Sequence, residues 1–219
     1  MTSASQVDIS IIIPVLNESE NLERCLASLP ADFNVDVIVC DGGSADDSLE
    51  IAQQSGASVV SSDRGRAQQM NAGARVALGD ILLFLHADTL LPENAIASIR
   101  RAVKDEFSMG CFERVFDTPH PLLRYTSKCA GWRARKFFLA YGDQAIFIRR
   151  DLFEKLDGYR LMRRFEDMDL ALRAKKHGRW IVLPDTVTTD ARRFGKSPIK
   201  RVLKDAWLTV AWLIGLIKE

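Results

Sequence analysis

The stretch Ile81–Thr89, ILLFLHADT, decides the expected fold, because a run of apolar residues ends abruptly in a polar triplet. Ile81 to Leu85 have the length and composition of a strand that is buried on both faces, as in a parallel sheet covered by helices. The triplet then leaves the core at the carboxyl end of this strand, the edge where open α/β sheets bind ligands. We therefore expect Asp88 to be a ligand for a divalent cation. The alternative is that Asp88 only caps the next helix or shapes the turn before Pro92.

Composition limits the class of protein. The chain has 219 residues and is 47% hydrophobic, which is enough to bury the core of one domain. Its 30 basic and 29 acidic residues give no sign of nucleic-acid binding. The four cysteines are scattered without zinc-like spacing, and the first ten residues, MTSASQVDIS, do not resemble a signal peptide. We therefore expect a cytoplasmic protein with reduced thiols.

Strands and helices alternate through the first half of the chain. Strands are expected at residues 9–13, 35–40, 57–61 and 81–85. The helices between them begin near Asn17, Ser44 and Ala67, and Asn17 and Ser44 can cap the first two. This βαβαβαβ order with short connections is typical of a parallel sheet covered by helices on both faces. Right-handed crossovers then bring the segments 14–18, 41–44 and 86–89 to one edge. No GxGxxG follows the first strand, which argues against a dinucleotide-binding dehydrogenase.

The second half of the chain has a less regular pattern. Helices are expected at residues 93–103, 122–138, 150–156 and 167–177, and strands at 111–116, 145–148, 180–183 and 186–189. A polar turn, Tyr141-Gly142-Asp143-Gln144, precedes the second of these strands.

The converging edge carries residues that suit a nucleotide diphosphate. Asp88 can bind the cation that accompanies a diphosphate, and the oxygens of Asp41 and Glu18 can accept hydrogen bonds from a base or a ribose. Four arginines can pair with phosphate oxygens, namely Arg64, Arg66, Arg192 and Arg193. Each residue also has a purely structural interpretation: Glu18 next to a helix dipole, Asp41 in an Asx turn, and the arginines as solvated charges.

Glu166-Asp167 is a second candidate centre. Two adjacent carboxylates at a helix N-terminus are stabilised by the helix dipole, which is their structural interpretation. In the functional interpretation, one of them faces a pocket and acts as the general base for an attacking hydroxyl. His86 either assists at the metal as a neutral ring or hydrogen-bonds to nearby backbone.

Five motifs, taken in order, resemble family 2 glycosyltransferases of the GT-A fold. They are IIIPVLNE (11–18), DGGSADDS (41–48), NAGARVALGD (71–80), LHADT (85–89) and FEDMDLALR (165–173). The DxD metal motif of the family here reads His86-Ala87-Asp88, which is similar to a bacterial subgroup with HADT at this position. Gly142-Asp143-Gln144 and the arginine pair at 192–193 also match this subgroup.

The resemblance implies a Rossmann-like, mostly parallel sheet and inverting transfer of a sugar from a nucleotide-diphosphate sugar to an acceptor hydroxyl. Asp88 would bind Mg or Mn, and Asp167 would be the general base with Glu166 beside it. Gly142, Asp143 and Gln144 would contact the acceptor. The donor would be bound by Pro14, Asn17, Glu18, Asp41, Gly43, Arg66, Asn71, His86, Arg192 and Arg193.

Two other functions stay open. One is a catalytically inactive protein that binds a nucleotide sugar, and the other is a nucleotidyltransferase. The intact Glu166-Asp167 pair argues against the first, because binding alone needs no base. The second is disfavoured because no glycine-rich, lysine-containing loop follows the first strand.

The tail is expected to form an apolar helix. We divide the chain into a catalytic domain, 1–195, with a nucleotide-sugar half up to about residue 105 and an acceptor half after it, and a tail, 196–219. Residues 206–217 are apolar apart from Thr209, a stretch too short to cross a bilayer. The helix can pack on the domain, form a homodimer, or lie on the inner face of the membrane, which would suit a lipid-linked acceptor.

Overall fold

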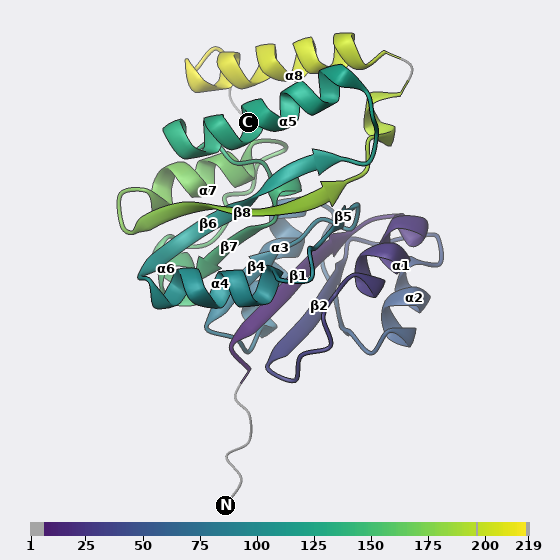
Figure 1. Cartoon of the computed structure of the whole chain (residues 1–219). Coiled ribbons are helices and arrows are strands. Elements are labelled where there is room, and N and C mark those ends of the chain that lie inside the picture. The colour runs from purple at the N-terminus through teal and green to yellow at the C-terminus, as the bar shows by residue number, and fades with distance from the viewer. Residues whose placement is uncertain (1–6, 196, 218–219) are drawn as a thin grey trace, which may run out of the picture.

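The computed structural model describes residues 7–195 and 197–217 and contains one eight-stranded sheet between helices (Figure 1). The strand order is β3-β2-β1-β4-β7-β6-β8-β5. The strands are β1 (Ile9–Val15), β2 (Val35–Asp41), β3 (Ser58–Ser61), β4 (Ile81–Phe84), β5 (Thr89–Leu90), β6 (Phe107–Phe116), β7 (Ile146–Arg149) and β8 (Arg179–Thr189). The first four are parallel, as predicted, whereas β7 runs antiparallel to both β4 and β6.

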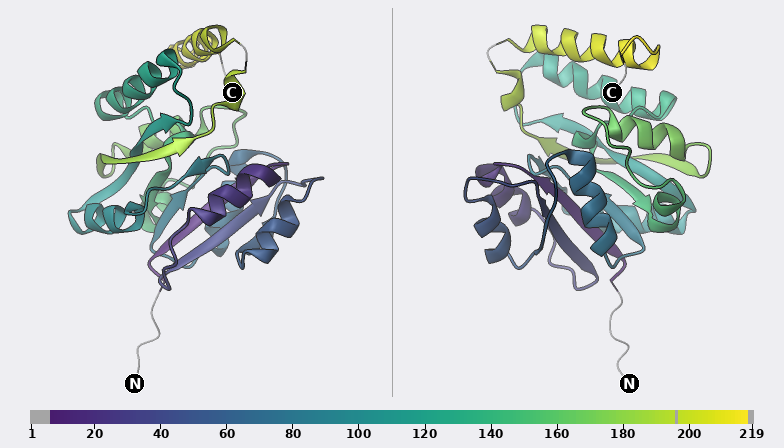
Figure 2. Two further views of the ribbon diagram at one scale, coloured as in Figure 1. Left: turned by 45° about the vertical axis from the view of Figure 1, so that its right-hand side comes forward. Right: turned by 180° about the vertical axis from the view of Figure 1, so that it is seen from behind.

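Helices cover both faces of the sheet. They are α1 (Ser19–Ala27), α2 (Ser48–Gln54), α3 (Arg66–Val76), α4 (Ala95–Lys104), α5 (Pro121–Phe137), α6 (Arg150–Lys155), α7 (Glu166–Ala174) and α8 (Pro198–Leu213), with short 3-10 turns η1 (Gly142–Gln144) and η2 (Arg192–Phe194). Both views in Figure 2 show α5 and α8 side by side at one end of the molecule. No helix within the described ranges is long and apolar enough to cross a membrane.

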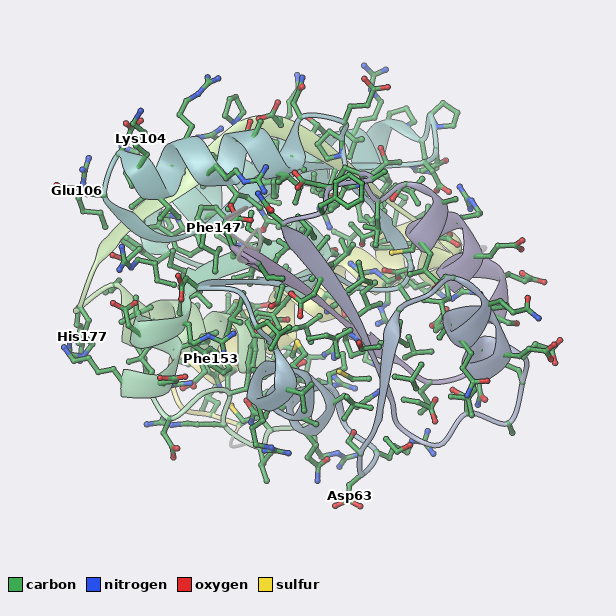
Figure 3. The ribbon with its side chains drawn as sticks, turned by 90° about the horizontal axis from the view of Figure 1, so that it is seen from below. Asp63, Lys104, Glu106, Phe147, Phe153 and His177 are labelled. Atoms are coloured by element: carbon green, nitrogen blue, oxygen red, sulfur yellow. The ribbon has the colours of Figure 1, made fainter. Side chains whose placement is uncertain are left out.

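The alternation of side chains along β1 produces two separate cores. Ile9, Ile11 and Ile13 pack with α1, α2 and α4 on one face of the sheet. Ile12 points to the other face and packs with α3, α6 and α7. Figure 3 shows Phe147 and Phe153, which belong to these two cores, inside the molecule and the exposed His177 at its periphery. The prediction of a sheet covered on both faces is confirmed.

Two local features depart from the predicted elements because of proline. β1 continues through Pro14, since pairing with β4 ends at Ile12 and the missing N–H of Pro14 faces no strand there. The two strands predicted at 180–183 and 186–189 are one strand, β8. Its pairing with β6 skips from Leu183 to Thr186, and this irregularity accommodates Pro184.

The capping predictions at the sheet edge are wrong. Asn17 has a φ of 54° and lies before the N-cap of α1, and its side chain accepts a hydrogen bond from Ala45 N–H (2.7 Å). Ser44 likewise precedes α2 by several residues and accepts a hydrogen bond from Asn17 N–H (2.9 Å). Both residues tie the loop after β1 to the loop after β2.

Gln69 of α3 holds the ends of β1 and β2 together. Its buried Nε2 donates to Val15 O (2.7 Å) and Cys40 O (2.8 Å). The replacement Gln69→Leu should lower the free energy of unfolding by about 1–3 kcal/mol, because a buried carbonyl loses its donor. Urea unfolding measures this, with Gln68→Leu as the control. An equal loss in both variants would contradict this role.

Candidate active site

The three predicted loops converge at one edge of the sheet, beyond the carboxyl ends of β1, β2 and β4. The loop after β1 is bonded to the loop after β2 through Asn17 and through Glu18, whose N–H donates to Ser48 Oγ (2.9 Å). The loop after β4 faces the same space, because His86 and Asp88 line a cavity together with Pro14 and Glu18. The convergence inferred from topology is therefore confirmed.

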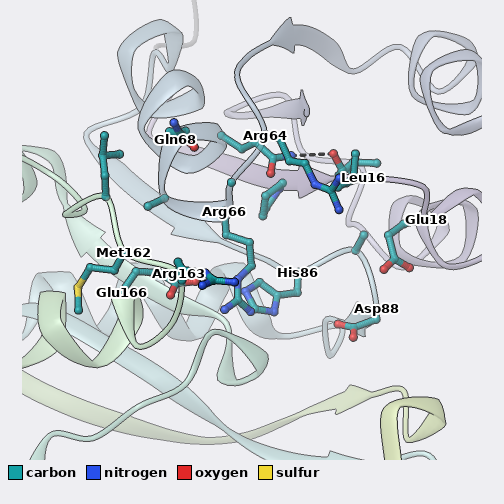
Figure 4. Close-up of a pocket in the computed structure, with 17 residues that line it drawn as sticks. Leu16, Glu18, Arg64, Arg66, Gln68, His86, Asp88, Met162, Arg163 and Glu166 are labelled. Atoms are coloured by element: carbon teal, nitrogen blue, oxygen red, sulfur yellow. Dashed lines mark hydrogen bonds and ion pairs between the residues drawn. The ribbon is translucent and has the colours of Figure 1, made fainter. Parts of the chain in front are cut away.

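This donor-side cavity has a volume of about 610 Å³ (Figure 4). Six of the predicted site residues line it: Pro14, Glu18, Arg66, His86, Asp88 and Glu166. Arg64 lines it as well, and the segment Leu161–Arg163, which the sequence did not single out, forms part of its wall. In Figure 4, Arg66 and His86 lie between Glu166 and Asp88.

The loop that carries Asp88 is held on both sides. Asp88 O accepts a hydrogen bond from Asp190 N–H (3.0 Å), and the buried Thr89 hydroxyl donates to Asp88 Oδ1 (3.2 Å). Burial raises the pKa of Asp88, and the Asp143 carboxylate adds to this effect. The carboxylate therefore lies where an additional positive charge would be stabilised.

His86 is neutral in this environment. Burial lowers the pKa of its imidazole to about 4, and the Arg66 guanidinium acts in the same direction. The buried Nε2 atom of His86 has no hydrogen-bond partner among the described residues. A neutral imidazole with one unpaired nitrogen can accept a hydrogen bond from a bound group or donate one to it.

The Glu166-Asp167 pair is buried at the start of α7. Arg66 Nε lies 2.7 Å from Glu166 Oε1, an ion pair without hydrogen-bond alignment, so both Glu166 oxygens lack a hydrogen bond in the described part of the chain. Asp167 Oδ2 accepts a hydrogen bond from Gly142 N–H (2.9 Å), whereas its Oδ1 has no such partner there. Burial and the Glu166 charge raise the pKa of Asp167 to about 7.

The pair separates two cavities. Asp167 faces a second, acceptor-side cavity of about 180 Å³, which also contains Arg66 and His86. Its wall is completed by residues of η1 and its cap, of the turn before α7, of η2 and of α8: Tyr141, Gly142, Asp143, Arg164, Phe165, Arg193, Arg201, Asp205 and Leu208. A Cβ atom at Gly142 would collide with His86 and lie 2.7 Å from Asp167 Oδ2, so only glycine fits there.

Asp143 anchors two arginines. Its Oδ2 accepts hydrogen bonds from Arg114 Nη1 (2.6 Å) and Arg193 Nη2 (2.8 Å). Although burial acts in the opposite direction, these two guanidiniums hold the pKa of Asp143 well below its usual range. Arg114 was not expected as a site residue. The only signal for Arg114 in the sequence is its charge within the otherwise mostly apolar strand CFERVF, and this signal does not show which residue it pairs with.

Arg192 lines neither cavity, but it pairs with Glu18, which lines the donor-side cavity. Its guanidinium forms ion pairs with Glu18 and with Asp190 (3.5 Å). These contacts join η2 to the loop after β1, although the two segments are 174 residues apart. The predicted arginine pair therefore reaches the site through two different carboxylates, Glu18 and Asp143.

Six predicted residues line neither cavity: Asn17, Asp41, Gly43, Asn71, Gln144 and Arg192. The amide of Asn71 holds the backbone of Tyr159 through two hydrogen bonds, and Gln144 is fully buried and donates to Phe112 O (3.2 Å). The oxygens of Asp41 accept from Gly43 N–H and Ser44 N–H, the arrangement of an Asx turn. Asn71 and Gln144 therefore have structural contacts, and the binding roles of Asn71, Gln144, Asp41 and Gly43 stay predictions.

The fold resembles those of proteins solved in complex with nucleotide sugars. Mannosyltransferase PcManGT from Pyrobaculum calidifontis, solved in complex with GDP-Man and Mn2+, superposes with a TM-score of 0.66 at 20% identity over 82% of this chain and 56% of that one. S. aureus TarS 1-349 in complex with UDP-GlcNAc gives 0.70 at 16% identity over 84% and 59%. At these identities the likeness shows the fold alone, and the prediction of a GT-A fold is confirmed.

Sequence comparison shows the family. The model of glycosyl transferase family 2 matches residues 10–169, so the chain belongs to this family of glycosyltransferases. Glycosyltransferase AglE from Haloferax volcanii is 33% identical over 36% of this chain and 30% of its own length. The PGL/p-HBAD biosynthesis glycosyltransferase of Mycobacterium bovis (strain BCG / Pasteur 1173P2) is 39% identical over 38% and 36%. The chain spans about a third of the length of these curated relatives.

Replacing Asp143 should destabilise the protein. In Asp143→Asn, the buried Arg114 loses its charge partner, which costs about 3–5 kcal/mol of the free energy of unfolding at pH 7. Because the folded-state pKa of Asp143 is lowered, its contribution exists above the unfolded-state pKa, about 4, and disappears as the pH falls further. Urea unfolding at several pH values should show the gap between wild type and variant narrowing below pH 4.

The control for this prediction is Asp151→Asn. Asp151 pairs with Arg149, but its side chain is 71% exposed. Its replacement should change the free energy of unfolding by less than about 1 kcal/mol. If Asp143→Asn has an equally small effect, the carboxylate is not the anchor of Arg114 and Arg193.

Proposed function

We propose that this protein transfers a sugar from a nucleotide-diphosphate sugar to an acceptor hydroxyl with inversion at the anomeric carbon. The observation that carries the proposal is the division of the Glu166-Asp167 pair between the donor-side and acceptor-side cavities. The two cavities meet at Arg66 and His86. A donor in one and an acceptor in the other would place the reacting atoms beside the unpaired Asp167 oxygen.

The donor would occupy the larger cavity. Glu18 and Asp41 would accept hydrogen bonds from the nucleoside, while Arg64, Arg66 and Arg192 would face the diphosphate. Complexes of structurally similar enzymes with GDP-Man and UDP-GlcNAc support a nucleotide sugar as the ligand class. The nucleotide-sugar half would then be residues 1–105, and the acceptor half residues 106–195.

The donor set at Asp88 fits a cation that arrives with its substrate. The described residues contain no group of three or more His, Cys, Asp or Glu side chains that could hold a metal ion by themselves. A single carboxylate is nevertheless sufficient where diphosphate oxygens and water complete the coordination, as is usual for Mg. When bound there, Mg or Mn would neutralise charge on the departing diphosphate, with Asp88 as its protein ligand. The Mn2+ in the PcManGT complex supports this assignment.

Asp167 would act as the general base. Its raised pKa lies near neutral pH, where a base combines sufficient basicity with a sufficient population of the ionised form. The Gly142 N–H holds Oδ2, which leaves Oδ1 to accept the proton from the acceptor hydroxyl. Inversion requires one displacement and no protein nucleophile. A protein that only binds nucleotide sugars has no need for an unpaired, buried carboxylate oxygen in a second cavity.

Removing the Asp88 carboxylate should abolish metal-dependent nucleotide binding. For Asp88→Ala, calorimetric titration with GDP or UDP in the presence of Mn should show at least a tenfold weaker affinity, because the protein ligand to the cation is lost. Asp63→Ala is the matched control, since Asp63 does not line the donor-side cavity. Unchanged affinity of Asp88→Ala would exclude the metal-binding role.

Replacing Asp167 should stop turnover without preventing donor binding. In Asp167→Asn, the release of nucleoside diphosphate from a bound donor, with water as acceptor, should slow about a hundred- to ten-thousand-fold. In the wild type this rate should rise with pH and level off above pH 7, as Asp167 loses its proton. Near-normal release by Asp167→Asn would assign the base role to Glu166 or Asp143. The variant Glu166→Gln would then distinguish between these two residues.

A further inference from the structure

Helices α5 and α8 form a layer in which the positive charge of the molecule is concentrated. The whole chain has a formal net charge of +1, yet this α5–α8 layer contains eight basic residues and one acidic residue, Asp205. Five of the cations are exposed and have no ion-pair partner among the described residues: Arg124, Lys128, Lys136, Lys200 and Lys204. The rest of the chain must therefore be net negative.

The outer face of α8 carries an exposed apolar stripe. Ile199, Leu203, Trp207, Val210 and Ile214 follow one another at intervals of three or four residues, so they share one side of the helix. All five are more than half exposed, from 56% to 66%. Burial against the catalytic domain, one of the expected roles of this helix, does not apply to this stripe.

The exposure of the stripe is not the result of a loosely attached helix. The inner side of α8 is fixed to the active site, where Trp212 stacks on Phe165 with ring centroids 5.1 Å apart and the Thr209 hydroxyl bonds to the Tyr141 hydroxyl. Thr209 and Ala211 are buried. The helix therefore has one partnered face and one face without a partner in the described chain.

Helix α5, which lies beside α8, carries exposed aromatic side chains of its own. Tyr125 is 66% exposed and Trp132 is 56% exposed, and they lie between the free cations of the same helix. Exposed aromatic and aliphatic groups beside lysines and arginines are the composition of helices that lie in a membrane interface. Tyrosine and tryptophan favour the level of the headgroups, because one end of the ring is apolar and the other polar.

We propose that the α5–α8 layer docks on the surface of an anionic lipid bilayer. Its unpaired cations complement acidic headgroups, while the stripe on α8 enters the boundary with the acyl chains. A homodimer through this face would bring two strongly positive layers together, which is unfavourable. A nucleic acid would neutralise the cations but leave the aliphatic stripe exposed to water.

The location of the layer has a consequence that rests on the proposed function. Arg201, Asp205 and Leu208 belong to α8 and form one wall of the acceptor-side cavity. An acceptor held in the bilayer would therefore approach Asp167 from the side of the protein that meets the lipid. The docking itself requires neither a donor nor catalysis, so it can be tested separately from the sugar transfer.

Co-sedimentation of the full chain with lipid vesicles tests the proposal. The protein should bind vesicles that contain phosphatidylglycerol and should bind phosphatidylcholine vesicles weakly, with binding reduced by high salt. Two double variants, Lys200→Glu/Lys204→Glu and Leu203→Ser/Trp207→Ser, should each lower the vesicle partition coefficient about tenfold or more. All four side chains are exposed, so the fold should persist.

Controls match each change at a surface remote from the layer. The control Arg101→Glu/Lys104→Glu reverses two exposed charges on α4. The control Phe33→Ser/Leu78→Ser removes two exposed apolar side chains. Neither control should alter vesicle binding. The proposal is overturned if the protein ignores anionic vesicles, or if control and layer variants lose binding equally. It is also overturned if the layer variants change only the gel-filtration size or the binding of duplex DNA.

Discussion

The site depends on burying two adjacent carboxylates, Glu166 and Asp167, at the start of one helix. Like charges this close resist simultaneous ionisation, so the pair needs compensating groups. Arg66 supplies a cation for Glu166, Gly142 N–H supplies a hydrogen bond for Asp167, and the N-terminus of α7 adds the positive end of its dipole. These groups do not fully offset the burial of Asp167 and the nearby Glu166 charge, so the pKa of Asp167 stays raised. A base with a neutral-range pKa is thus a direct product of the local electrostatics.

Each compensating group comes from a different part of the chain, and the sheet brings them together. Arg66 begins α3 after β3, Gly142 begins η1 before β7, and Glu166 begins α7. The left-handed conformation of Phe165, with a φ of 67°, turns the chain into α7 so that successive carboxylates reach two cavities. The antiparallel β7, inserted between β4 and β6, places η1 next to the loop after β4. His86 and Gly142 consequently meet.

The parallel half of the fold could be predicted from the sequence because its strands are buried and its connections are short. Apolar runs such as Ile81–Leu85 require cover on both faces, and handedness then determines which loops converge. The Arg114–Asp143–Arg193 cluster could not be predicted in this way. Arg114 and Asp143 are 29 residues apart, and Asp143 and Arg193 are 50 residues apart. Their ion pairs form only because the antiparallel strands and η2 bring these residues together, and a local sequence pattern does not show which distant residues meet. The capping role predicted for Asn17 is wrong for a related reason. The same side-chain oxygen can accept a hydrogen bond from the first turn of a helix or, as here, from the backbone of another loop.

Net charge illustrates the same limit for surfaces. A net charge near zero is found in a molecule whose charges are evenly mixed and also in one that carries opposite charges on separate faces. Only the packing of α5 beside α8 shows that the second case applies here. The inner face of α8 supports Phe165 and Tyr141, which flank the residues that fix Asp167. A helix required for the geometry of the site therefore also presents the apolar stripe, so the two properties occur together in the folded chain.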